Sequence, residues 1–275
     1  MKKIKERLDK LLPELGLADT RNKAQALIMA GKVRVNDQVI TKAGAMFERT
    51  PELNITLDEI PKWAGRGAKK LLRAFEVFNL DVKNKICADF GASTGGFTDV
   101  LLENGAKKVY AIDVGYGQLI WRLANDSRVV VMDRTNARYL TRENFSDKIN
   151  FASCDVSFIS LKLILPVIDK ILDPKGQAVV LIKPQFEAGR EKISNSNGVV
   201  KDKKIHAEVL ENMINFIRSE TKFFIAGLTH SPIRGAEGNT EFLCYLTHEE
   251  INFNLNFNIN DIVDKAHENF EGNKN

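Results

Sequence analysis

The apolar residues at the start of the chain recur with the period of a helix. Leucine and isoleucine side chains fall on one face at Ile4, Leu8, Leu11, Leu12 and Leu15. Gly16 follows them as a stop signal. The pattern therefore predicts a first helix over residues 4–15.

A second helix and a hairpin are predicted directly afterwards. Thr20 is a suitable N-cap for the helical pattern of residues 21–30, and Gly31 takes the position that follows the helix. The segment 32–40 then places two short apolar runs on either side of an Asn-Asp turn, which favours a hairpin. Together these elements predict a small α+β domain.

The rest of the chain has the alternating pattern of an α/β fold. Leucine and phenylalanine residues share one helical face over residues 68–80, and short apolar runs alternate with helical stretches after that. The runs predict seven strands, over residues 85–91, 108–114, 128–135, 149–157, 177–184, 222–230 and 240–248. Such alternation is typical of a Rossmann-like, mostly parallel sheet with helices on both faces. The short connection before the last strand predicts that this strand is antiparallel.

These elements divide the chain into four parts. We expect a small domain at residues 1–60, a linker at 61–67, a large α/β domain at 68–248 and a C-terminal tail at 249–275. The linker has a proline and two glycines around Trp63, which favour irregular structure. In the tail, residues 251–260 alternate apolar and asparagine residues, which indicates an edge strand or a loose extension.

The charge is distributed unevenly along the chain. The 275 residues carry a formal net charge of +4, with 40 Lys+Arg against 36 Asp+Glu. Residues 1–75 hold 16 basic and 9 acidic side chains (+7), which leaves 24 against 27 (−3) for the remainder. A basic N-terminal segment followed by a mildly acidic remainder indicates an anionic partner, although a solvated charged surface would give the same charge distribution.

No targeting or cross-linking signal stands out. The chain starts with charged residues, and no apolar run approaches the roughly 18 residues that a membrane helix needs, so we expect a cytoplasmic protein without a membrane span. Cys87, Cys154 and Cys244 lie far apart in apolar runs. Such cysteines are ordinarily buried thiols, and neither a zinc site nor a disulfide framework is indicated.

The basic residues of the N-terminal domain predict contact with a phosphate backbone. Arg7, Arg21, Lys23, Lys32 and Arg34 cluster around the second helix and the hairpin, where they could contact a phosphate backbone, and Arg66 of the linker joins them as a candidate. The segment TRNKAQALIMAGKVRVNDQVI resembles the small RNA-binding domain of ribosomal protein S-four and of pseudouridine synthases. Structured RNA is recognised largely by shape, so a compact basic module suits this task.

A glycine-rich loop after the first strand of the α/β domain predicts a nucleotide cofactor. Helix amides at such a loop bind anions, and an acid at the next strand end binds ribose hydroxyls. The candidate cofactor-binding residues are Gly91, Ala92, Ser93, Thr94, Gly95, Gly96, Phe97, Asp113, Asp133 and Asp155. We expect Asp113 to accept the ribose hydroxyls and Asp133 the adenine amino group, since ligands bind outside the carboxyl ends of parallel strands.

S-adenosylmethionine is favoured over a dinucleotide as that cofactor. The glycine loop is short, and it lacks the GxGxxG spacing that binds a pyrophosphate. The predicted sheet also has seven strands, which favours S-adenosylmethionine. The simpler alternative is that the acids cap strand ends and the glycines turn the chain. The ordered series of acids after successive strands argues against that alternative.

A set of motifs gives the chain a closer resemblance. GRGAKKL, DFGASTGGFTDVLL, AIDVGYGQL, DRTNAR, CDVSFISL, KPQFEAGR and SPIRGAEGNTEFL occur in this order. Together with the basic module they resemble the TlyA-type haemolysin family of ribosomal RNA 2′-O-methyltransferases, whose catalytic domain is similar to the FtsJ methyltransferases. The resemblance implies S-adenosylmethionine as cofactor and ribosomal RNA or a ribosomal subunit as partner. Residues 65–68 depart from the family's Ser-Arg-Gly-Gly, and the tail matches nothing in the pattern.

The resemblance also implies a catalytic set of Lys70, Asp155, Lys183 and Glu241. Asp155 and Lys183 follow parallel strands, and Glu241 begins a strand that would start at the same edge if it is antiparallel. A ribose hydroxyl is a poor nucleophile, so Lys183 could act as a base or, while charged, stabilise the developing alkoxide. The purely structural alternative is that Lys183 and Glu241 form a salt bridge at the sheet edge, while Lys70 lies on a solvated helix face.

Three other functions compete with this interpretation. An RNA-binding protein with an inactive methyltransferase-like domain would have the same fold, but it would not need the complete loop and catalytic set. A dehydrogenase is disfavoured by the missing GxGxxG spacing. A membrane-active haemolysin would need a long apolar or basic amphipathic helix, and the sequence offers neither.

Overall fold

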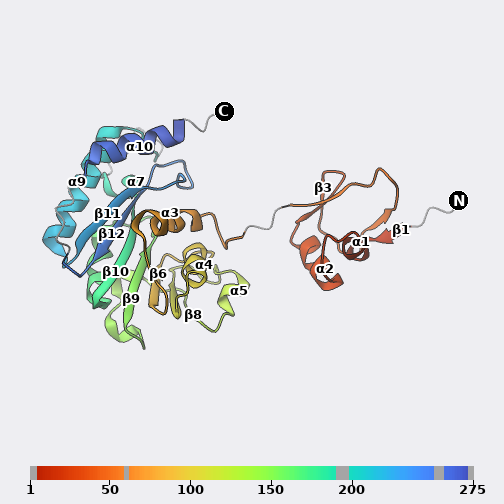
Figure 1. The fold of residues 1–275 in the computed structure, drawn as a ribbon, viewed down its shortest axis with the longest axis horizontal. Coiled ribbons are helices and arrows are strands. Elements are labelled where there is room, and N and C mark those ends of the chain that lie inside the picture. Colours follow the sequence, from red (N-terminus) through yellow and green to blue (C-terminus); the bar gives the residue numbers. More distant parts are fainter. Residues whose placement is uncertain (1–4, 59–61, 190–197, 251–256, 272–275) are drawn as a thin grey trace. The chain divides into compact units, whose positions relative to one another are not determined.

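The structure of the protein is a computed structural model that describes residues 5–58, 62–189, 198–250 and 257–271 (Figure 1). The chain divides into two compact units, Met1–Lys62 and Trp63–Asn275. Each unit has its own hydrophobic core, so each is described by itself.

The N-terminal unit consists of short strands and two helices. Its elements are β1 (Lys5–Arg7), α1 (Leu8–Glu14), α2 (Arg21–Met29), β2 (Val33–Val35), β3 (Gln38–Ile40), β4 (Met46–Glu48) and β5 (Ile55–Leu57). Strand β2 pairs antiparallel with β3 and with β5, and β1 pairs antiparallel with β4. Side chains of α1, α2 and β2, among them Leu12, Ile28 and Val33, form the core between them.

The structure confirms the second helix and the hairpin and corrects the first helix. The Thr20 hydroxyl accepts from the backbone N–H of Lys23 at 3.2 Å, as expected of an N-cap. Asn36 and Asp37 have positive φ angles of 47° and 66°, which a tight hairpin turn requires. The prediction of a helix from residue 4 was wrong, because Lys5–Arg7 forms a strand on β4 and the helix begins at Leu8. Pairing with a distant strand overrides the local period here.

The second unit consists of a seven-stranded sheet with helices around it. The strands are β6 (Ile86–Phe90), β7 (Lys108–Ile112), β8 (Val129–Met132), β9 (Ile149–Cys154), β10 (Leu172–Ile182), β11 (Phe224–His230) and β12 (Phe242–Thr247). The α-helices are α3 (Ala68–Phe78), α4 (Gly96–Glu103), α5 (Trp121–Ala124), α6 (Leu165–Ile171), α7 (Pro184–Glu187), α9 (Lys203–Glu220) and α10 (Ile259–Glu271). Among the described residues, three single-turn 3₁₀ helices lie at Ala137–Tyr139, Arg142–Asn144 and Leu161–Leu163.

The strand order is β11-β12-β10-β9-β6-β7-β8. Strand β12 is antiparallel to both β10 and β11, and the other neighbouring pairs are parallel. The predicted fold class is therefore confirmed, including the antiparallel last strand. This topology brings the ends of β6, β7, β8, β9 and β10 and the start of β12 to one edge of the sheet.

Each face of the sheet carries its own core. Residues of α3, α4 and α5 cover one face, and residues of α6, α9 and α10 cover the other. Figure 1 shows α9 and α4 on opposite sides of the sheet. Alternate residues of one strand belong to different cores: Cys87 packs under α4, whereas Ala88 points to the opposite face.

The C-terminal tail differs from the prediction. Residues 251–256 lie outside the described residues, so the predicted strand or extension is not described there. Ile259 and Asn260, however, belong to helix α10, which the sequence analysis did not predict. Val263 and Ala266 of α10 are buried, because this helix packs on the sheet unit. Among the described helices, none is both long enough and apolar enough to cross a membrane.

Candidate active site

Two neighbouring cavities open at the edge where the parallel strands end. The first, of about 350 Å³, is lined by Lys70, Asp155, Lys183 and Glu241, and we call it the tetrad cavity. The second, of about 330 Å³, is lined by Asp113, and we call it the Asp113 cavity. Both are lined by Gly91, Ser93, Asp155, Ser157 and Phe158. A ligand in one cavity would therefore touch the wall of the other.

The glycine loop is folded so that the backbone of β9 can approach it closely. The N–H groups of Gly91 and Ala92 both donate to the Ile112 carbonyl, at 2.9 and 3.0 Å. Gly91 has φ +79°, and a Cβ atom there would lie 2.7 Å from the Asp155 carbonyl oxygen. Gly95 also has a positive φ, and a Cβ there would meet Leu123. Only glycine suits these two positions.

Asp113 and Asp133 follow adjacent strands but play different structural parts. The Asp113 carboxylate accepts from the N–H groups of Ser93 at 2.8 Å and Gly115 at 2.7 Å, and it lines its cavity. The Asp133 carboxylate accepts from the Gly117 N–H at 2.8 Å. In the described part of the chain, Asp133 lines neither of the two cavities, and Thr135 and Asn136 stand at the wall instead.

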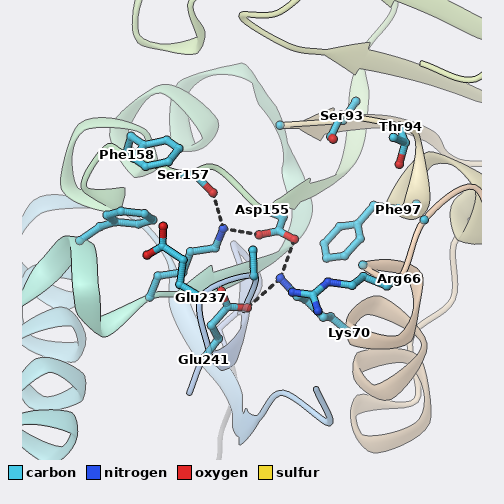
Figure 2. A pocket seen from close by; sticks show the side chains of 18 of the residues that line it. Arg66, Lys70, Ser93, Thr94, Phe97, Asp155, Ser157, Phe158, Glu237 and Glu241 are labelled. Carbon is cyan, nitrogen blue, oxygen red and sulfur yellow. Dashed lines mark hydrogen bonds and ion pairs between the residues drawn. The ribbon is translucent and has the colours of Figure 1, made fainter. Parts of the chain in front are cut away.

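The four residues implied by the family resemblance form one chain of ion pairs. The Lys70 ammonium lies 3.0 Å from Asp155 Oδ2 and 2.7 Å from Glu241 Oε2. The Lys183 ammonium lies 2.6 Å from Asp155 Oδ1 and donates to Ser157 Oγ at 2.8 Å. Figure 2 shows these contacts at the cavity wall. The structure thus joins in one cluster a residue of α3, the residues that follow β9 and β10, and the residue that precedes β12.

The cluster is buried, and its opposite charges stabilise the ionised forms of Lys70 and Asp155. Lys70 is 6% exposed, Lys183 6% and Glu241 2%. Burial by itself would lower the pKa of Lys70, but the charges of Asp155 and Glu241 outweigh it, so the pKa is raised. Burial would raise the pKa of Asp155, but Lys183 and Lys70 outweigh it, so that pKa is lowered. Lys70 and Asp155 therefore stay charged near neutral pH.

The segment before α3 fixes the position of Lys70. The Ala64 N–H donates to Asp99 Oδ2 at 2.8 Å, and Asp99 is also ion-paired with Arg122. Backbone bonds from the N–H groups of Ala68 and Lys70 to Gly65 and Gly67 then start the helix. Lys70 lies in the first turn of α3, where its side chain reaches the cavity. The amphipathic period of α3 places Leu71 in the core, so the helix cannot rotate freely.

An aromatic pair at the tetrad cavity was missed by the sequence analysis. Phe158 and Phe186 both line the cavity, with ring centroids 5.4 Å apart. Phe158 is 87% exposed and has φ +63°, which is strained for a bulky residue. An exposed aromatic ring on a strained backbone is a recurrent feature of ligand sites. The only sequence signal was the placement of both residues just after strand ends.

The candidate RNA-binding residues of the N-terminal unit have unequal surroundings. Arg7 and Arg21 both form ion pairs with the buried Asp9, at 2.8 and 3.1 Å. Hydrogen bonds from Arg7, and then from Gln25 and Arg21, outweigh burial and hold the pKa of the Asp9 carboxyl well below its usual range. Arg34 pairs with Asp58 at 2.7 Å.

The remaining candidate RNA-binding residues are Lys23, Lys32 and Arg66. Lys23 is exposed and Lys32 half-buried, and neither has an ion-pair partner within the described residues. In the second unit, Arg66 is exposed at the tetrad cavity and donates to the Arg234 carbonyl at 3.3 Å. Within the described residues, Lys23 and Lys32 thus lack ion pairs of the kind that hold Arg7, Arg21 and Arg34.

Comparison with known proteins identifies both parts of the chain. Residues 63–248 match the FtsJ-like methyltransferase family, and residues 6–49 match the S4 domain. The chain belongs to the FtsJ-like methyltransferase family. The matched region contains both cavities and the whole ion-paired cluster.

Relatives of this chain are named either as rRNA methyltransferases or as hemolysins. YqxC of Bacillus subtilis, described as a candidate rRNA methyltransferase, is 51% identical over 244 residues, covering 88% of this chain and 85% of the relative. TlyA of Mycobacterium tuberculosis, a 16S/23S rRNA (cytidine-2′-O)-methyltransferase, is 41% identical over 87% of this chain and 89% of its own. A solved structure from Streptococcus thermophilus, described as a candidate hemolysin, superposes with TM-score 0.73 at 44% identity, over 98% of each chain. The TlyA-type resemblance is confirmed.

Proposed function

We propose that the protein transfers a methyl group from S-adenosylmethionine to a ribose 2′-hydroxyl of ribosomal RNA. The observation that carries the proposal is the buried Lys70–Asp155–Lys183–Glu241 cluster of the tetrad cavity, whose Asp155 also lines the Asp113 cavity. One cavity suits the cofactor and the other the target nucleotide. Methyl transfer needs these two ligands side by side, with charged groups at their junction.

The Asp113 cavity has the lining that an adenosine group needs. Asp113 keeps acceptor sites beyond the two backbone amides it already holds, because a carboxylate has about four of them. Apolar side chains such as Ile112, Val114 and Ala137 offer a surface for the base. The close approach of Gly91 to Asp155 places the loop backbone at the wall that both cavities share. S-adenosylmethionine would fit here, and it supplies an activated methyl group on its sulfonium.

The cluster would align and activate the ribose hydroxyl. Lys70 is held between two carboxylates, so its charge fixes Asp155 and Glu241. Lys183 has one carboxylate and one hydroxyl partner, which leaves part of its amine facing the cavity. The Lys183 amine would accept the hydroxyl proton or, as an ammonium, stabilise the alkoxide. Positioning of the hydroxyl in line with the methyl group supplies much of the rate.

Phe158 and Phe186 would hold the base of the target nucleotide. An unstacked RNA base is commonly stabilised on aromatic side chains, and both rings stand at the cavity next to Lys183. We expect a cytidine as the target, as in the names of the TlyA relatives. Work on ribosomal RNA would place the protein in the cytoplasm.

The cofactor assignment is tested by calorimetry on the purified protein. We expect S-adenosylmethionine to bind, with Gly91, Gly95 and Asp113 at the site, and NAD not to bind. Binding of NAD without S-adenosylmethionine at millimolar ligand would favour the dehydrogenase alternative. Absence of binding of either ligand would favour an inactive RNA-binding protein. Mapping of ribose methylation in ribosomal RNA from a deletion strain then identifies the target.

RNA binding by the S4 domain should depend on Lys23 and Lys32. We expect the Lys23→Ala/Lys32→Ala double variant to bind ribosomal RNA more weakly, with a salt dependence flatter by roughly one log-log unit per lost phosphate contact at most. Arg21→Ala should also weaken binding, but it removes a partner of the buried Asp9, so its thermal unfolding must be measured too.

Lys107→Ala provides the matched control, because Lys107 is exposed just before β7, at the opposite edge of the sheet from both cavities. The readout is affinity over a series of salt concentrations. Equal affinities for the double variant and the control would exclude this docking face.

A further inference from the structure

Helix α10 lies outside the matched methyltransferase region, yet it packs into the same core. The family match ends at residue 248, and α10 spans Ile259–Glu271. Val263 is 2% exposed and Ala266 fully buried, in the core that also contains residues of α9 and β11. Figure 1 shows α10 beside α9. The helix is therefore an integral part of this unit, and its position constrains its neighbours.

The first link from α10 to the active site is a cation–π contact. The Arg234 guanidinium lies over the Phe270 ring, 4.9 Å from its centroid. Arg234 belongs to the connection 231–241 between β11 and β12, which ends at Glu241. The carbonyl of Arg234 accepts from Arg66, a residue of the tetrad cavity, at 3.3 Å. Phe270 thus holds one side of this connection.

The second link is a hydrogen-bond relay through two histidines. His206 of α9 is fully buried; its Nε2 lies 3.1 Å from the Val200 carbonyl and its Nδ1 3.0 Å from His267 Nε2 of α10. Burial, and then the charge of His267, lower the pKa of His206 to about 4, so its ring is neutral at pH 7. A carbonyl only accepts, so His206 Nε2 carries the proton and His267 donates to His206 Nδ1.

The relay continues from Val200 to the same connection. The Val200 N–H donates to Asn239 Oδ1, and Asn239 Nδ2 donates to the Gly198 carbonyl, both at 2.9 Å. Asn239 is 1% exposed, so these bonds are shielded from water. Its own carbonyl accepts from the Gly235 N–H at 2.9 Å. Both links from α10 therefore meet in the segment 234–239.

This segment determines where the Glu241 carboxylate lies. A Cβ atom on Gly235 would stand 2.6 Å from Glu241 Oε1, so the backbone of the connection touches that carboxylate. The Glu241 carbonyl also accepts from the Ser231 N–H at 2.8 Å, which closes the connection at its base. A shift of the segment would move Glu241 away from Lys70, its partner at 2.7 Å.

We infer that α10 is a strap that positions Glu241, with Phe270 and His267 as positioning residues for methyl transfer. The inference rests on the proposed function, because it assigns α10 a part in that reaction. The two links reach the connection at different residues, Arg234 and Asn239, so the connection has one preferred position while α10 is docked. The Asp113 cavity is lined by other segments, so cofactor binding should not depend on the strap.

The test compares Phe270→Leu with Phe270→Tyr in the full-length protein. Leucine keeps the apolar packing but has no π face, whereas tyrosine keeps the ring. We expect Phe270→Leu to lower the single-turnover methylation rate by roughly 2- to 30-fold, the range of a cation–π contact. Its affinity for S-adenosylmethionine should stay within about 2-fold of the wild type, and amide exchange in residues 231–241 should become faster. Phe270→Tyr should restore both the rate and the protection.

Lys265→Ala is the control, since Lys265 lies on the exposed face of α10 and pairs with Asp261. It should keep wild-type rate and exchange. A wild-type rate and wild-type exchange in Phe270→Leu would overturn the inference, as would an equal loss of cofactor affinity and rate. If the wild type itself did not methylate ribosomal RNA, the proposed function would fail. The exchange measurement would still decide whether α10 holds the connection.

Discussion

A folded Lys183→Ala variant is expected to methylate ribosomal RNA about 10² to 10⁴ times more slowly than the wild type, because it lacks the base or the alkoxide partner. The loss should fall on the chemical step, since Lys183 lines the tetrad cavity and pairs with Asp155, whereas the lining of the Asp113 cavity does not include it. Asp155 keeps Lys70 as its ion-pair partner, so no carboxylate is left buried and unpaired. Single-turnover kinetics with saturating cofactor measure the effect.

Two further variants make this result interpretable. Lys183→Arg keeps a positive charge but cannot act as a base, so substantial remaining activity would favour electrostatic stabilisation. Lys162→Ala removes an exposed lysine of the same unit and should leave the rate unchanged. Thermal unfolding verifies that each variant is folded. Near wild-type turnover in folded Lys183→Ala would refute the role that we propose for the cluster.

Gly91→Ala is expected to abolish most cofactor binding. The added Cβ would lie 2.7 Å from the Asp155 carbonyl oxygen, a backbone atom that cannot move without shifting the end of β9. Such a shift would disturb the wall shared by both cavities, so we expect the affinity for S-adenosylmethionine to fall at least about 10-fold. The positive φ of +79° adds about 1–2 kcal/mol of destabilisation. Calorimetric titration and thermal unfolding measure the two effects.

Gly105→Ala is the matched control for the backbone strain. Gly105 has φ +86°, but a Cβ there would make only ordinary contacts with Lys83, at 3.5 Å or more. It lies before β7, at the opposite edge of the sheet. This variant should lose similar stability from strain while keeping its cofactor affinity. If Gly91→Ala bound the cofactor as well as Gly105→Ala does, the loop would not have the role we propose.

The parts of the fold that the sequence predicted are those set by local period and chain connection. Thr20 caps α2 because its hydroxyl satisfies a free backbone N–H, whatever surrounds it. The seven strands alternate with helices, and this alternation leaves few topologies open. Once the last strand is antiparallel, its start must meet the ends of the parallel strands. That is why the sequence alone predicts Asp155, Lys183 and Glu241 at one edge of the sheet.

The parts that the sequence did not predict depend on distant partners. Lys5–Arg7 continues a helical period but pairs with β4, which lies about 40 residues later. Helix α10 is stabilised by burying Val263 and Ala266 on the sheet unit, and the asparagine-rich run at residues 251–260, which overlaps its start, indicated a strand or an extension instead.

Arg7 and Arg21 illustrate the same difficulty for function. Each looked like a free cation in the sequence, but both are bound to a buried aspartate. Phe158 shows the reverse case, because its exposure and strained backbone appear only in the folded chain. Charge and residue type predict chemistry, whereas the pairing of charges is a property of the tertiary structure.

The most direct test of the central claim is where the methyl group is placed. Purified protein is incubated with S-adenosylmethionine and ribosomal subunits from a strain that lacks the gene, and the RNA is digested to nucleosides for mass spectrometry. We expect a cytidine whose added methyl group fragments with the ribose, formed by the wild type and reduced by about 10² or more in Lys183→Ala. A methyl group on the base, or no methylated nucleoside from the wild type, would contradict it.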